Sequence, residues 1–157
     1  MIGSYAANTG NDYHDWAIRQ HAAELLRYRD TEGNRELLLK VIRTDDDSDV
    51  VMMAYESARL LWNVGDEQCS EVDYALIQGA CPEADDKALE RIVKHAPTAD
   101  LLMLLGADYA LDDEDELAEL LQQLGESLLS RDDYSAAELS TALQSENAVV
   151  VSIVARL

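Results

Sequence analysis

Residues 38–61 read LLKVIRTDDDSDVVMMAYESARLL, and this stretch decides the fold class. The apolar residues from Leu37 to Ile42 recur at the spacing of one helical face. The aspartates of residues 45–49 interrupt that pattern and offer capping groups for a second helix. Residues 50–63 are apolar nearly all round, which is typical of a helix enclosed by neighbours. The stretch therefore predicts two helices joined by a short acidic turn.

The same helical spacing continues on both sides of this hairpin. One run, Val149–Val151, favours a strand by β propensity, but a lone strand has no partner, so we expect a helix there as well. The chain is thus expected to be all-α, with residues 1–12 as a flexible N-terminal arm and residues 13–157 as a single domain of about eight or nine short helices. The expected helices cover residues 13–29, 34–43, 50–63, 70–78, 85–96, 98–105, 117–128, 136–143 and 150–157.

The hairpin of residues 38–61 resembles a HEAT-type repeat, which has a leucine-rich first helix, an acidic turn, and a second helix with Val and spaced Ala. Residues 139–157 are similar. Gly79-Ala80 and Gly106-Ala107 each follow an apolar run and precede an aspartate pair, which is a weak internal repeat with an offset of 27 residues. The resemblance implies irregular HEAT-like hairpins stacked as an α-solenoid and a binding role, and it transfers no functional residue.

Charge narrows the classes of partner. The chain carries 12 Lys and Arg against 32 Asp and Glu, a net charge of −20. Residues 1–65 contribute −4 and residues 66–157 contribute −16. Such a surface repels nucleic-acid phosphates and anionic membranes, so it argues against direct binding to either. The negative charge favours a basic protein as partner. The alternative is that the acidity serves only solubility or adaptation to high salt.

No catalytic constellation, cofactor motif or metal site stands out. In the helix expected at residues 13–29, the apolar stripe consists of His14, Ile18, His21 and Leu25, with Ala22 and Leu26 beside it. The two histidines lie two helical turns apart, too far to share a metal, and are expected at the edge of the core. Cys69 and Cys81 lack zinc spacing and form no disulfide framework. Together with the absence of a signal sequence, they indicate a reducing, cytoplasmic compartment. The alternating aspartates of residues 45–49 suggest a calcium loop. Counted from Asp45, however, the sixth position is Val50, where such a loop requires glycine, so helix capping is favoured over calcium binding.

The candidate partner-binding residues lie around the helix expected at residues 117–128. The acids of residues 112–116 precede it, and the first of them stabilise its positive N-terminal end. Five neighbouring acids exceed what capping requires, so we expect an acidic ridge, with a solvated helix face as the alternative. The candidate residues are Asp108, Asp112, Asp113, Glu114, Asp115, Glu116, Glu119, Glu126, Asp132 and Asp133.

These observations predict a non-enzymatic interaction protein that binds, and inhibits, a basic nucleic-acid-binding protein or nuclease. Immunity, antirestriction and anti-CRISPR proteins are of this type, and DNA mimicry is its sharpest form. One alternative is a helical scaffold or assembly subunit with incidental acidity, which would form a homodimer through the helix at the C-terminal end. The other is an enzyme with catalytic carboxylates in a concave pocket.

Overall fold

The structure is a computed structural model that describes residues 12–133, 135–144, 146 and 148–156, and all regular secondary structure in these residues is helical. The fold class predicted from the sequence is therefore confirmed. The described residues form nine α-helices and a 3-10 helix. These are α1 (Asp12–Leu26), α2 (Glu32–Thr44), α3 (Ser48–Leu61), α4 (Glu71–Ile77), η2 (Pro82–Ala84), α5 (Asp86–His95), α6 (Thr98–Leu105), α7 (Glu114–Leu129), α8 (Ala136–Leu143) and α9 (Ala148–Val154).

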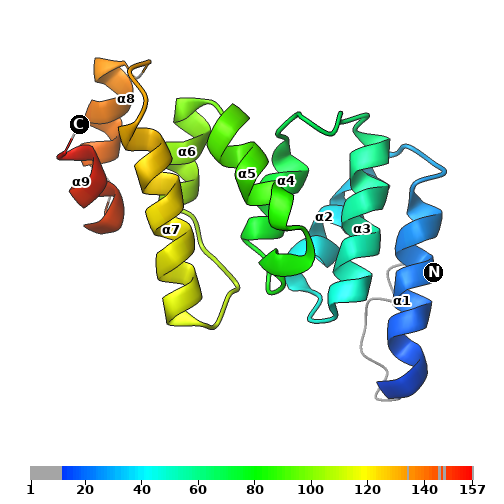
Figure 1. Cartoon of the computed structure of the whole chain (residues 1–157). Coiled ribbons are helices and arrows are strands. Elements are labelled where there is room, and N and C mark those ends of the chain that lie inside the picture. Colours follow the sequence, from blue (N-terminus) through cyan, green and yellow to red (C-terminus); the bar gives the residue numbers. More distant parts are fainter. Residues whose placement is uncertain (1–11, 134, 145, 147, 157) are drawn as a thin grey trace.

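The helices follow one another across the molecule in chain order, from α1 at one end to α8 and α9 at the other (Figure 1). Consecutive helices pair as the hairpins α2–α3, α4–α5, α6–α7 and α8–α9, and α1 packs on α3. Each hairpin contacts its neighbours in this series, so the domain is an irregular stack of helical pairs. This arrangement is compatible with a helical repeat fold.

One hydrophobic core runs through the whole stack. It extends from Ala23 on α1 to Val154 on α9 and includes the fully buried Tyr55 of the central helix α3. The leucine stripe predicted on α7 is confirmed, because Leu120 and Leu128 both point into this core. Because the leucine stripe is buried, the opposite face of α7, which carries the carboxylates, is exposed to solvent.

Side-chain caps explain where several helices begin. Asp47 caps α3 by accepting hydrogen bonds from the backbone amides of Asp49 and Val50, at 3.0 and 3.2 Å. Asp45, at the end of α2, is ion-paired with Arg19 of α1, with 3.0 Å between Arg19 Nε and Asp45 Oδ2. Two of the aspartates in the acidic turn thus serve helix ends and packing, as the capping interpretation predicts.

The face that α1 buries differs from the prediction. Ile18, His21 and Leu25 were expected on the buried stripe, but their side chains are exposed, with 62% of the Leu25 surface accessible. Leu26, which was expected beside the stripe, is buried, and so is Ala23. Among the described residues, α1 packs mainly on α3, and it is turned so that Arg19 reaches Asp45 on the α2–α3 turn. The predicted N-terminal arm, residues 1–12, lies outside the described residues except for Asp12, and so does the side chain of His14.

Gly79 sets the spacing between the first two hairpins. It follows α4 closely, and a Cβ atom there would lie 2.6 Å from the backbone oxygen of Ile42 and 3.3 Å from the Cα atom of Arg43. Both are backbone atoms at the end of α2, so no side-chain rotation could relieve the overlap. Only glycine allows the ends of α2 and α4 to approach this closely.

Candidate functional site

All ten acids that the sequence singles out are exposed. Asp112 and Asp113 precede α7, the acids of residues 114–116 form its first turn, and Glu119 lies one turn further on. We call Asp112 to Glu116 together with Glu119 the α7 acidic surface. The structure therefore brings six of the ten predicted residues together at one end of one helix, and Asp108 lies in the loop that leads into it.

The remaining predicted residues lie elsewhere along α7. Asp132 and Asp133 follow the C-terminal end of α7, which at about 1.5 Å per residue lies roughly 24 Å from its first turn. Glu126 lies in between and accepts a hydrogen bond from Gln122 at 2.8 Å. The length of α7 therefore separates Asp132 and Asp133 from the acids of its first turn.

Two of the predicted acids have structural tasks. Asp113 is the N-cap of α7 and accepts hydrogen bonds from the amides of Asp115 and Glu116, at 2.9 and 3.1 Å. Asp133 accepts a hydrogen bond of 2.7 Å from the hydroxyl of Thr98, the first residue of α6. A partner that engaged these two carboxylates would compete with contacts that hold the fold.

The ion pairs are confined to the first part of the chain. The acids that form ion pairs among the described residues include Glu24, Asp30, Asp45, Asp73 and Asp85. From Asp86 onward, none of the described acids has an Arg, Lys or His within ion-pair distance. The negative charge of the α7 acidic surface is therefore not cancelled by local cations.

The α7 acidic surface opens into a groove between α5 and α7, with a volume of about 310 Å³. Its apolar lining comes from Ile77, Pro82, Leu89 and Leu120. Carboxylates stand on both walls, and the lining contains no Lys, Arg or His. The acids of this α5–α7 groove are Glu83, Asp85 and Asp86 on the η2 and α5 side and Glu116 and Glu119 on the α7 side.

A larger groove of about 660 Å³ lies between α3 and α5. Its lining is mixed in charge: Arg59, Lys87, Arg91, Lys94 and His95 stand among the acids Glu56, Asp66, Glu67, Asp85 and Glu90. Asp85 lines both this α3–α5 groove and the α5–α7 groove.

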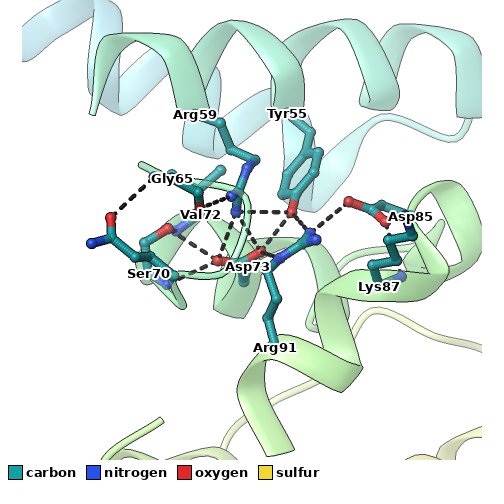
Figure 2. Close-up of polar contacts among 10 residues, drawn as sticks. Tyr55, Arg59, Gly65, Ser70, Val72, Asp73, Asp85, Lys87 and Arg91 are labelled. Atoms are coloured by element: carbon teal, nitrogen blue, oxygen red, sulfur yellow. Dashed lines mark hydrogen bonds and ion pairs between the residues drawn. The ribbon is translucent and has the colours of Figure 1, made fainter. Parts of the chain in front are cut away.

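A largely buried ionic cluster joins Asp73 to Tyr55, Arg59, Asp85 and Arg91, four residues that line the α3–α5 groove (Figure 2). Asp73, which is fully buried on α4, accepts hydrogen bonds from Tyr55, from Arg59 at 3.0 Å and from Arg91 at 3.1 Å. Arg91 also donates to the Tyr55 hydroxyl and, at 2.6 Å, to Asp85. We call these five residues the Asp73 network; it joins α3, α4 and α5.

The electrostatics of the Asp73 network shift the pKa values of three of its members, Tyr55, Arg91 and Asp85. Burial and the hydrogen bond to Asp73 raise the pKa of the Tyr55 hydroxyl far above its usual range. Burial is the largest single effect on Arg91 and Asp85, and it opposes both charges. Their mutual hydrogen bond and the other hydrogen bonds and charges around them together outweigh it, so the pKa of Arg91 is raised and that of Asp85 is lowered. Neither Tyr55 nor Arg91 exchanges protons near neutral pH, as a general acid or base must.

The remaining reactive side chains do not assemble into a site. Burial raises the pKa of the Cys69 thiol to about 11, so the nucleophilic thiolate is scarce at neutral pH. His21 is exposed and lies 3.4 Å from Glu24. In the part of the chain that the structure describes, no group of three His, Cys, Asp or Glu side chains is placed to hold a metal ion.

Sequence reasoning missed the Asp73 network and one wall of the α5–α7 groove. The signal for Asp73 was a charged residue inside an apolar run. Asp73 also stands three residues after Ser70, and the two residues form a capping box at the start of α4. Glu83 and Asp86 gave no comparable signal, because their proximity to Glu116 arises only when the second and third hairpins pack.

Comparison with protein-family models, with curated proteins and with solved structures gives no match. Within the described residues, the helices are all too short or too polar to traverse a lipid bilayer.

Proposed function

We propose that this chain is a non-enzymatic interaction protein whose α7 acidic surface binds a basic partner protein. The observation that carries the proposal is the lack of ion pairs beyond Asp85 among the described acids, since an uncancelled charge remains available to a partner. Electrostatic attraction would steer a basic partner and speed its association.

We further propose that the partner is a nucleic-acid-binding protein or nuclease that this chain inhibits, as immunity, antirestriction or anti-CRISPR proteins do. Carboxylates three or four residues apart on a helix lie about 5–6 Å from each other. Such a series can occupy Lys and Arg groups that otherwise grip phosphates, which is DNA mimicry. The free Cys69 and Cys81 support a cytoplasmic location, and the hairpins α2–α3 and α8–α9 support a HEAT-like repeat.

The experiment is capture of the partner from the native source by the parent chain and by a triple variant, Asp112→Lys, Glu116→Lys and Glu119→Lys. Asp113 stays unchanged because it caps α7. We expect the triple variant to lose the partner, and the parent to release it as salt rises from about 0.05 to 0.5 M, because screening weakens the attraction.

The matched control reverses three exposed acids outside the α7 acidic surface: Glu36→Lys, Asp46→Lys and Asp49→Lys. It changes the net charge by the same amount and should keep the partner. Equal retention by the parent and the first triple variant would refute the proposal.

A scaffold function is the second candidate, and one observation favours it. An apolar groove of about 380 Å³ between α6, α8 and α9 is lined by Leu102, Met103 and Val150, and Met103 is 53% exposed. A partner, or a second copy of the chain, held there by apolar contact would be insensitive to salt. The capture experiment at two salt concentrations separates the two functions.

A further inference from the structure

The α5–α7 groove differs from the other grooves of the stack because it combines an apolar floor with walls of a single charge. Ile77 and Leu120 are buried at its floor, and Leu89 is half-buried beside them. Glu116 and Glu119 stand on the α7 wall, opposite acids on the η2 and α5 side. The α3–α5 groove is mixed in charge, and the groove at α6, α8 and α9 has one acid, Glu138.

We infer that the α5–α7 groove binds an amphipathic basic helix of the partner, with aliphatic side chains on the groove floor and arginines on its rim. This inference rests on the proposed function and names the part of the partner that is recognised. A purely electrostatic contact would need no apolar floor, and a purely apolar contact would not tolerate five carboxylates around it.

The spacing along α7 suits a helix as the occupant. Glu116, Glu119 and Gln123 all line the groove, at the offsets 0, +3 and +7, which extend over about 10 Å of the axis. A helix lying along α7 presents its own side chains at the same repeat, so two of its turns can place charged groups beside Glu116 and Glu119.

Arginine suits this groove better than a short cation does. Its aliphatic stem can lie along Leu89 and Leu120 while the guanidinium reaches carboxylates at the rim. Its planar fork can bind a carboxylate through two hydrogen bonds, and the two walls supply acids on either side. Because Asp85 is already bonded to Arg91, the acids free to receive it are Glu83, Asp86, Glu116 and Glu119.

The test uses two fluorescein-labelled synthetic peptides of identical Leu and Arg composition. In one, Leu and Arg occupy opposite faces at helical spacing over about four turns. In the other the order is scrambled so that no apolar face forms. Each is titrated by fluorescence anisotropy against the full chain and against two double variants. Glu116→Gln with Glu119→Gln removes charge from the groove, and Glu36→Gln with Asp46→Asn removes the same charge from exposed positions outside the α7 acidic surface.

The amphipathic peptide should bind the parent more tightly than the scrambled peptide does. The groove variant should weaken it by about tenfold, as expected for two charge contacts, whereas the matched control should change its affinity by less than about twofold. Thermal unfolding of each variant checks that the fold is retained.

Equal affinity for the two peptides, or equal losses in the two double variants, would overturn the inference and leave only attraction by the overall charge. Absence of binding by both peptides would overturn it as well. The proposed function is decided separately by capture of the native partner with the lysine variants, so the failure of one is distinguishable from the failure of the other.

Discussion

The substitution Asp73→Asn tests whether the Asp73 network stabilises the central hairpins. Both carboxylate oxygens are engaged: Oδ1 accepts from Tyr55, Arg59 and Arg91, and Oδ2 accepts from the Ser70 amide at 2.8 Å. The amide keeps the shape of the side chain but removes the charge and turns one acceptor into a donor. The loss of two charge-assisted hydrogen bonds costs about 1.5–3 kcal/mol each, and a broken buried ion pair costs about 3–5 kcal/mol. Both ways of estimating the loss in the free energy of unfolding thus give a similar value.

The free energy of unfolding should therefore fall by about 3–5 kcal/mol, and the thermal midpoint by roughly 10 °C. Urea unfolding followed by circular dichroism at neutral pH measures it. Asp30→Asn is the control, because Asp30 also binds an arginine, Arg35, through two hydrogen bonds but with 55% of its side chain exposed. Tyr55→Phe gives a graded loss if Asp73→Asn does not fold. Equal midpoints for Asp73→Asn and Asp30→Asn would refute the reasoning.

Three further predictions concern packing, pH and thiol chemistry. Gly79→Ala should lower the free energy of unfolding by about 1–3 kcal/mol, whereas Gly106→Ala, whose added Cβ would lie 3.5 Å from its nearest neighbour, should change it little; urea unfolding compares them. Desolvation raises the pKa of Asp45, so the folded state binds a proton at this carboxyl more tightly than the unfolded state does. The contribution of Asp45 to stability therefore falls as pH rises above about 4. Asp85, whose pKa is lowered, loses its contribution as pH falls below about 4, so Asp45→Asn and Asp85→Asn should shift the pH profile of unfolding in opposite senses. Cys69 should react with iodoacetamide at pH 7 much more slowly in the folded chain than in urea, which mass spectrometry can follow.

The helices of the second half could be predicted because their signals are local. The helix expected at residues 98–105 is α6, with the same bounds, and the leucines expected on one face of α7 are those that the core buries. Periodicity and capping groups act within a few residues, so a single sequence contains the information needed to place them.

The rotation of α1 could not be predicted in this way. Its sequence has two apolar faces, one with Ile18 and Leu25 and the other with Ala23 and Leu26. The choice between them depends on Arg19, which pairs with Asp45, a residue 26 positions away. The Asp73 network depends in the same way on three helices that meet only in the folded chain. Local patterns thus predict which segments are helical, whereas tertiary contacts decide which faces they bury.

Asp85 takes part in both the Asp73 network and the α5–α7 groove, since it accepts a hydrogen bond from Arg91 and also lines that groove. A guanidinium held by Glu83 or Asp86 in that groove would also attract the Asp85 carboxylate, and would so weaken its bond to Arg91. Occupancy of the groove and cohesion between α3, α4 and α5 would then be thermodynamically linked, and the linkage is reciprocal. Substitutions at Tyr55 or Arg59, which do not contribute to the α5–α7 groove, should accordingly alter how tightly a ligand is held there.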